Sequence, residues 1–153
     1  MLAGILYERR HTYEIAEFGG LATPMPKYAT FFLMGVLASV GLPLMNGFIG
    51  EFLVLTGAFQ AKPWYGILGA TGVIWSAGYL LWMYQRVFFG KVSHNVNNSL
   101  PDLDGREQTA LVPIVVMALV MGVAPILWLN AIDPAVQAAL MPFTNLVSKV
   151  VGQ

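Results

Sequence analysis

One carboxyl group, that of Glu51, lies inside an otherwise apolar part of the sequence. Residues 47–55 read Gly-Phe-Ile-Gly-Glu-Phe-Leu-Val-Leu, and the other acidic residues, like all the lysines and arginines, lie outside the apolar stretches or at their ends. A carboxyl group at membrane depth is costly and by default marks an ion or proton pathway. We therefore expect Glu51 to act as a proton relay.

Two effects act on the Glu51 carboxyl in opposite directions. Desolvation favours the neutral acid, whereas the positive N-terminal end of a half-helix favours the carboxylate. Asn46 is placed to cap such an end. A carboxyl balanced between these effects can exchange a proton when a nearby charge or water molecule changes. The alternative is a structural carboxyl that is hydrogen-bonded to Ser39, Thr56 or a free backbone amide.

The sequence before Glu51 predicts a break in the helix that carries it. As one straight helix, residues 28–61 would run about 51 Å, against a hydrocarbon core of about 30 Å, and they are too few for two crossings of about 20 residues each. Gly41, Pro43 and Gly47 lie near the middle of this stretch. We expect two half-helices with an irregular centre, a geometry that usually lines a cavity because freed backbone groups need polar partners.

Several polar side chains are candidates to line the path of a proton towards Glu51. They are Ser39, Asn46, Thr56, Ser76, Tyr79 and Tyr84. Each of them could instead make a hydrogen bond that packs one helix against another.

The elements that must position Glu51 are membrane helices. The 153 residues are 57% hydrophobic and only 10% charged, and the apolar residues come in long runs, so we expect an all-α membrane protein. Most lysines and arginines flank the spans on one side, which the positive-inside rule places in the cytoplasm. The expected order is the end of a truncated helix and a cytoplasmic loop (1–27), a discontinuous transmembrane helix (28–61), a transmembrane helix (62–89), a cytoplasmic loop (90–107), a transmembrane helix (108–130) and a C-terminal interfacial helix (131–153).

Signals at the helix starts refine this order. Asp104, followed by Glu107, is an acidic variant of the capping box before the third span. Asp133 and Pro134 offer an N-cap and a first-turn proline, so we expect the interfacial helix to begin there. The apolar residues before Glu8 predict the tail of a helix that begins upstream, as in the C-terminal piece of a longer protein. The alternative is a loosely ordered native N-terminus.

Composition also excludes several functions. The formal net charge is zero and no basic block is present, so we expect no nucleic-acid partner. The absence of cysteine excludes thiolate metal sites and cysteine nucleophiles. His11 and His94 fall in separate loops and are not expected to bind a metal. No phosphate-binding loop or dinucleotide fingerprint is present, so we expect no cofactor, NADH included, in this chain.

Taken together, the motifs resemble the subunit M family of the proton-pumping NADH-quinone oxidoreductase, respiratory complex I. The residues that carry the resemblance are Leu6–Thr12, Phe18–Ala22 with Met25–Pro26, Leu37–Pro43 followed by Gly47–Phe52, Tyr84–Gly90, and Leu103–Glu107. They cover residues 1–130 and are specific in combination. Leu44, Met45 and Asn46 depart from the small residues that the family usually has after Pro43.

The resemblance implies an antiporter-like helix bundle in the membrane arm of complex I of a bacterial inner membrane. The partners would be the other membrane-arm subunits, the lipid bilayer and protons. Related subunits typically place a lysine where Glu51 stands, and Glu51 would match the terminal member of a line of proton-carrying residues at mid-membrane. The chain would translocate protons as part of an NADH:quinone oxidoreductase and catalyse nothing alone.

Two other functions remain open from the sequence. The chain could be a subunit of a multisubunit sodium/proton antiporter or of a membrane-bound hydrogenase, because both use antiporter-like subunits. It could also be a structural remnant without a transport role.

Overall fold

The computed structural model describes residues 1–92 and 94–151, and these residues form helices and loops without a β-strand. The α-helices are α1 (Leu2–Arg10), α2 (Pro26–Ser39), α3 (Asn46–Ala61), α4 (Pro63–Phe88), α5 (Gly105–Val123) and α6 (Pro125–Val151). Two short 3-10 helices, η1 (Ile15–Glu17) and η2 (Asn95–Ser99), lie in the loops. The expected all-α architecture is confirmed.

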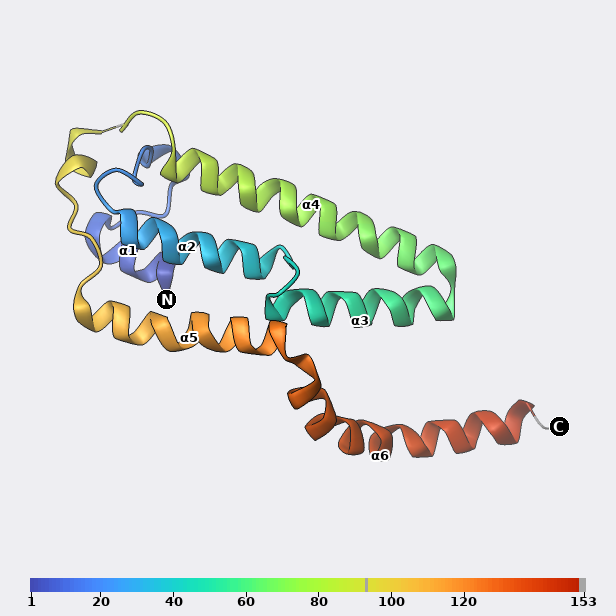
Figure 1. Ribbon diagram of the computed structural model, residues 1–153. Coiled ribbons are helices and arrows are strands. Elements are labelled where there is room, and N and C mark those ends of the chain that lie inside the picture. The colour runs from blue at the N-terminus through green and yellow to red at the C-terminus, as the bar shows by residue number, and fades with distance from the viewer. Residues whose placement is uncertain (93, 152–153) are drawn as a thin grey trace.

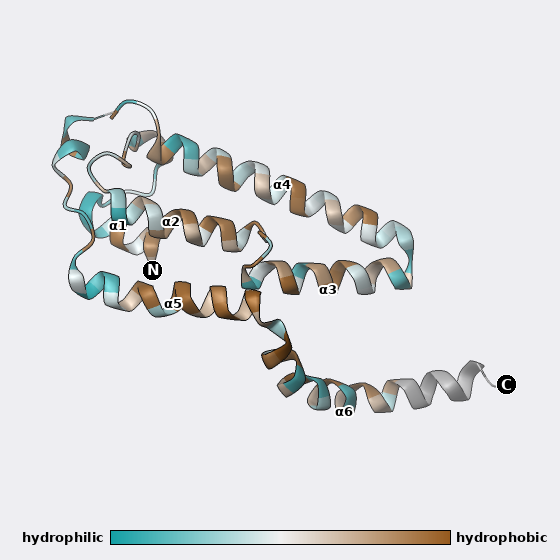
Figure 2. Ribbon diagram, in the orientation of Figure 1, coloured by the Kyte–Doolittle hydropathy of each residue, from teal (hydrophilic) through white to brown (hydrophobic). Residues whose placement is uncertain are grey.

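The helices form an elongated bundle around α2 and α3. These two half-helices follow one another along the bundle, α4 folds back beside both, and α5 lies on their other side (Figure 1). The loops, α1 and the N-terminus gather at one end and the turn between α3 and α4 lies at the other, whereas α6 leaves the bundle beside the break between α2 and α3 (Figure 1). The hydrophilic residues concentrate at the loop end and at the turn between α3 and α4, and the helices between them are mainly hydrophobic (Figure 2).

The predicted discontinuous helix is confirmed as α2 and α3. The segment that separates them runs from Val40 to Met45, and each half is shorter than a membrane span. In the described part of the chain, three stretches are long and apolar enough to cross a membrane on their own: Pro63–Phe88, Gly105–Val123 and Pro125–Phe143.

The buried apolar residues form a cluster near the loop end, where α1, α2, α4 and the loops meet. They are Ile5, Leu6, Phe18, Leu21, Met25, Tyr28, Ala29, Val36, Tyr84, Val87, Phe88, Leu100, Leu103 and Leu111. Aromatic rings join α2 to α4 in this cluster, with 5.0 Å between the centroids of Phe32 and Phe88, and Phe88 stacks on Tyr84 of its own helix with a centroid distance of 4.6 Å. Few residues of α4 are buried further along, so its apolar faces remain open to lipid or to other helices.

The loop between α1 and α2 closes the C-terminal end of α4. The last carbonyl groups of a helix have no partner inside it. Here the backbone N–H groups of residues 20–22 donate to the carbonyl oxygens of residues 87–89 at 3.0 to 3.3 Å. Gly20 suits this close approach because its φ of 65° is left-handed and a side chain would meet the backbone of Val92 at 2.8 Å.

Asp102 closes the N-terminal end of α2 from a distant loop. Its carboxylate accepts hydrogen bonds from the backbone N–H groups of Lys27 and Tyr28, each at 3.0 Å, and these are free donors in the first turn. Pro26 begins the helix, where its missing N–H costs nothing. The sequence offered no local cap for α2, since Asp102 lies 75 residues away from Lys27.

The predicted capping box at the start of α5 is confirmed. Asp104 accepts from the backbone of Glu107, whose own carboxylate accepts the Asp104 N–H at 2.9 Å. The same Glu107 carboxylate oxygen accepts a hydrogen bond from the guanidinium of Arg9 at 2.7 Å. Arg9 also donates to the carbonyl oxygen of Asp102 at 3.1 Å. The first turns of α2 and α5 are therefore tied to the end of α1.

The expected boundaries at the C-terminal side are wrong. The third span was expected to reach residue 130, but α5 ends at Val123 and α6 begins at Pro125. Pro125 has no N–H to continue α5 and pushes Ala124 out of the helical region, to φ −122° and ψ 59°. Asp133 and Pro134 lie inside α6 and do not open a helix.

The side chain of Asp133 has another partner within α6. It accepts a hydrogen bond from Gln137, one turn further on, at 2.6 Å. The interfacial position of residues 131–153 stays a prediction, since Pro125–Phe143 is also long and apolar enough to span. Residues 93, 152 and 153 lie outside the described residues.

Replacing Asp102 by Ala should destabilise the fold by about 1 kcal/mol, because two N–H groups of α2 lose their acceptor. The loss should appear as a lower thermal unfolding midpoint of the detergent-solubilised protein. Asp102→Asn keeps one side-chain oxygen, and its unfolding midpoint should lie between those of Asp102→Ala and the parent. Equal midpoints for Asp102→Ala and the parent would show that the hydrogen bonds from α2 contribute nothing.

Candidate functional site

Glu51 lies in the second turn of α3, with its carboxyl group turned back over the break between α2 and α3. The residue is half-buried. A side chain added at Gly41 would overlap the Oε2 oxygen of Glu51 and would lie 2.9 Å from its Cδ and 3.3 Å from Oε1. The carboxyl group therefore occupies the space that the absent side chain of Gly41 leaves open.

Gly41 is required for a second reason, because it ends α2. Its φ of 73° is left-handed, which glycine adopts without steric cost. The N–H of Leu42 donates to the carbonyl of Leu37 at 3.0 Å and that of Gly41 to Ala38 at 3.4 Å, which is the pattern of a Schellman motif. One glycine thus terminates the half-helix and makes room for the carboxyl.

A tight turn over residues 42–45 leads from this motif into α3. The N–H of Met45 donates to the carbonyl of Leu42 at 3.0 Å. Pro43 occupies the second position of the turn, and Leu44 the third, with a φ of 80°. This is the arrangement of a type II turn, in which the third residue is usually glycine. A leucine there costs about 1 to 3 kcal/mol and persists only where the surroundings enforce it.

The first turn of α3 packs against the end of α2. A side chain on Gly47 would overlap the carbonyl oxygen of Ala38, so only glycine permits this approach. The expectation that Asn46 caps α3 is wrong, because Met45 occupies the N-cap and makes no side-chain hydrogen bond to the helix. The turn places Asn46 inside the first turn of α3, where its side chain cannot reach back to the free backbone N–H groups at the start of the helix.

A cleft of about 280 Å³ opens beside the break, between α2, α3 and α5. Its lining residues are Met34, Gly35, Ala38, Ser39, Met45, Asn46, Gly47, Ile114, Val115 and Ala118. The polar side chains among them are Ser39 and Asn46, the two predicted lining residues nearest the break. The cleft is large enough for several water molecules and has polar partners for them at one edge.

The other predicted lining residues lie elsewhere. Thr56 donates its hydroxyl to the carbonyl of Phe52 in its own helix at 2.7 Å. Tyr84 is buried and donates to the carbonyl of Ala29 at 3.2 Å, which is the packing role that the sequence left as an alternative. Ser76 and Tyr79 lie in the middle of α4, half-buried and exposed respectively, and neither lines the cleft beside the break.

Among residues 1–92 and 94–143, no lysine or arginine forms an ion pair with Glu51. The ion pairs of these residues lie at the loop end: Arg9 with Glu107 at 2.7 Å, and Arg10 and His94 with Glu17 at 3.3 and 3.6 Å. The same residues contain no group of three His, Cys, Asp or Glu side chains that could hold a metal ion. Glu51 is thus a carboxyl without a cationic partner in the part of the chain described.

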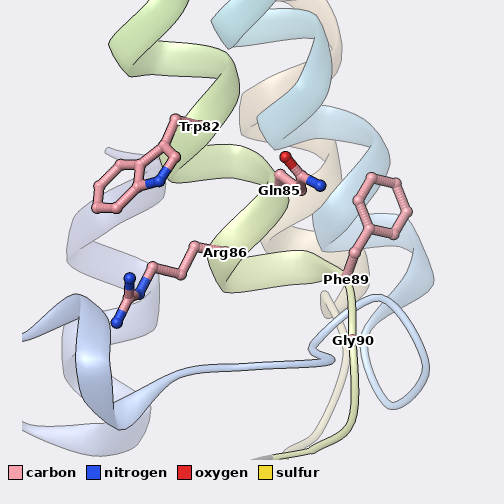
Figure 3. Close-up of a pocket in the computed structure, with 5 residues that line it drawn as sticks. All are labelled: Trp82, Gln85, Arg86, Phe89 and Gly90. Carbon is pink, nitrogen blue, oxygen red and sulfur yellow. The ribbon is translucent and has the colours of Figure 1, made fainter.

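A larger cleft, of about 430 Å³, lies at the C-terminal end of α4 and is lined by Trp82, Gln85, Arg86, Phe89 and Gly90. Figure 3 shows Trp82 and Arg86 on one side of the helix and Phe89 on the other. The Arg86 guanidinium lies 5.3 Å from the centre of the Trp82 ring, a cation–π distance. This cleft contains neither Glu51 nor any residue of the break.

Sequence reasoning missed the contribution of α5 to the break. A side chain on Gly122 would overlap the carbonyl group of Leu44 and would lie 2.5 Å from the carbonyl carbon of Met45. From the sequence, residue 122 was placed inside the span expected over 108–130 and was given no role. Gly66 and Gly69 allow α4 to approach α3, since a side chain there would meet Phe59 and Leu55, whereas Gly50, Gly57, Gly72 and Gly78 face open space.

These features define a membrane protein built of apolar helices, one of them broken, with a carboxyl group at the break. The sequence family described as NADH:quinone oxidoreductase/Mrp antiporter, TM, matches residues 1–76. The chain belongs to this family of antiporter-like membrane subunits.

Relatives and a solved structure support the same assignment. The chain is 43% identical over 136 residues to NADH-quinone oxidoreductase subunit M of Rhodobacter capsulatus, covering 89% of this chain and 27% of that protein. It is 38% identical over 136 residues to NADH-ubiquinone oxidoreductase chain 4 of Arabidopsis thaliana, covering 89% and 28%. A chain of respiratory complex I from Thermus thermophilus with bound NADH is similar with a TM-score of 0.82 and 40% identity, covering 90% of this chain and 28% of that one. The chain therefore spans little more than a quarter of the length of these relatives.

Replacing Gly41 by Ala should destabilise the protein by about 1 to 2 kcal/mol, because an L side chain is unfavourable at a left-handed φ and the methyl group would also displace the Glu51 carboxyl. Denaturant unfolding of the purified protein measures the loss. Gly50→Ala is the matched control, since Gly50 is helical, adjacent to Glu51 and faces open space. A destabilisation by Gly50→Ala that equals that of Gly41→Ala would contradict the special role of Gly41.

Proposed function

We propose that this chain translocates protons in the membrane arm of NADH-quinone oxidoreductase, driven by electron transfer to quinone elsewhere in the complex. The observation that supports this proposal most directly is the position of the Glu51 carboxyl group. It lies at a helix break and has no cationic partner among the residues described. The names of the relatives support this function, because both are subunits of NADH-quinone or NADH-ubiquinone oxidoreductase.

The arrangement of the break fits reversible protonation. The carboxylate takes up a proton to become the neutral acid and returns it on release, so the charge near the break changes by one in each cycle. A carboxyl with an adjacent salt bridge would resist this change, whereas Glu51 lies against glycine and backbone. The nearby cleft, with Ser39 and Asn46 at its edge, would hold the water molecules that connect Glu51 to other proton carriers.

The remaining parts of the function follow from the same assignment. The partners would be other membrane-arm subunits, lipids on the exposed apolar faces of α4 and α6, and protons. The location would be the inner membrane of a bacterium, with several crossings. The chain would act as a subunit of a proton-translocating enzyme, and no cofactor would bind within it.

A subunit of a sodium/proton antiporter remains the second candidate, because the family description includes the Mrp antiporter. The glutamate at position 51 favours the first candidate, since related antiporter subunits resemble this chain but typically carry lysine there. Proton transport that depends on sodium would favour the antiporter. A purely structural remnant would be favoured if neutralising Glu51 changed no activity.

Replacing Glu51 by Gln in the full-length subunit of the assembled complex tests the proposal. The amide keeps the shape but cannot bind and release a proton at neutral pH, so the rate of proton pumping per assembled complex should fall at least about tenfold, a change of about 1.4 kcal/mol in the transfer barrier. A pH-sensitive dye in membrane vesicles measures the pumping, and the amount of assembled complex should not change.

Two further variants complete this test. Glu51→Asp keeps a titratable carboxyl on a shorter stem and should retain part of the pumping. Glu14→Gln removes an exposed loop carboxyl and should retain all of it. Pumping at the parent level in Glu51→Gln would show that Glu51 does not carry the proton. The proposed function would then lose the residue on which it rests.

A further inference from the structure

The break between α2 and α3 is held from outside by α5. Leu44 has a φ of 80°, which a leucine does not adopt unless its surroundings enforce it. Its side chain does not supply that enforcement, because Leu44 is 64% exposed. The hydrogen bond from the Met45 N–H to the Leu42 carbonyl closes the turn and holds one side of the peptide group between Leu44 and Met45, whereas the Leu44 carbonyl on the other side of this planar group points away from that bond.

The neighbour that touches this peptide group is Gly122, near the C-terminal end of α5. Any side chain at Gly122 would overlap the carbonyl group of Leu44. The backbone of α5 therefore lies directly against the turn, and Gly122 is buried there. A contact between two backbones is rigid, since neither partner can move away by changing a rotamer.

The position of α5 is itself fixed at its other end. Its capping box includes Glu107, which binds Arg9, and the preceding loop carries the Asp102 carboxylate that caps α2. The helix α5 thus joins the beginning of α2 to the turn that follows α2. A shift of the turn would move Gly41, against which the Glu51 carboxyl rests.

We infer that Gly122 is a positioning residue for Glu51. Because Gly122 has no side chain, the backbone of α5 can lie against the Leu44–Met45 peptide group and hold the turn that sets the position of the carboxyl group. The inference rests on the proposed function, in which Glu51 is the residue that carries the proton. Gly122 touches no proton carrier itself and acts only through the turn.

The test compares three variants of the full-length subunit in the assembled complex. Gly122→Ala should lower the rate of proton pumping per assembled complex at least about threefold, which is within the effect of misplacing a reacting group by about 1 Å. Gly105→Ala, on the same helix but facing open space, should pump like the parent. Adding Leu44→Gly to Gly122→Ala frees the turn to move away from the methyl group and should restore at least half of the lost pumping.

Each outcome decides the inference. Unchanged pumping in Gly122→Ala, an equal loss in Gly105→Ala, or no rescue by Leu44→Gly would overturn it. If Gly122→Ala lowers the amount of assembled complex, recovery of assembly in the variant that also carries Leu44→Gly supports the contact with the turn, and failure to recover overturns it. In a Glu51→Gln background Gly122→Ala should cause no further loss, because both changes act on one group.

The proposed function fails separately from this inference. Pumping at the parent level in Glu51→Gln would overturn the role of Glu51 whatever Gly122 does. A strong loss in Glu51→Gln with full pumping in Gly122→Ala would leave the proton relay in place and overturn only the positioning role.

Discussion

The constraint on which the rest of this structure depends is that backbone polar groups have no water to bind inside a membrane. A helix satisfies this constraint internally, and a break in a helix violates it unless something else supplies partners. The six residues between α2 and α3 meet much of the demand through the Schellman motif at Gly41, whose bonds go to carbonyl groups of α2, and through the turn closed by Met45. The first N–H groups of α3 have no side-chain cap, and they lie beside the cleft lined by Ser39 and Asn46. Polar backbone and an ionisable side chain are thus concentrated at one place in an otherwise apolar bundle.

Local signals in the sequence predicted the break and the carboxyl group beside it. Gly41 and Pro43 each act on their own backbone, so the end of α2 could be placed from residue types alone. The capping box at Asp104 could be predicted for the same reason, because its two partners are three residues apart. The start of α6 was misplaced because Asp133 and Pro134 form an equally good local start signal, and the choice between it and Pro125 depends on where α5 ends.

Contacts between distant segments could not be predicted in this way. Asp102 is an unremarkable loop residue in the sequence, and its role depends on the folded path that brings it to Lys27. Gly122 was given no role from the sequence, since its contact with Leu44 is set by the packing of α5. The same limit applies to the polar lining. Ser39 and Asn46 lie at the cleft, but Thr56 and Tyr84 bind backbone carbonyls, and residue type alone does not tell these environments apart.

The cap that Asp102 provides for α2 has a consequence for the order in which the chain can mature. The helix start and its cap are 75 residues apart, which corresponds to about 4 to 15 s of synthesis at about 5–20 residues per second. During that interval both halves of the broken helix and all of α4 are synthesised before the carboxylate that completes the first turn of α2 exists. The N-terminal end of the broken helix is therefore finished late, by sequence on the far side of the next span, and a nascent chain arrested before residue 102 would expose that end to water or to the insertion machinery.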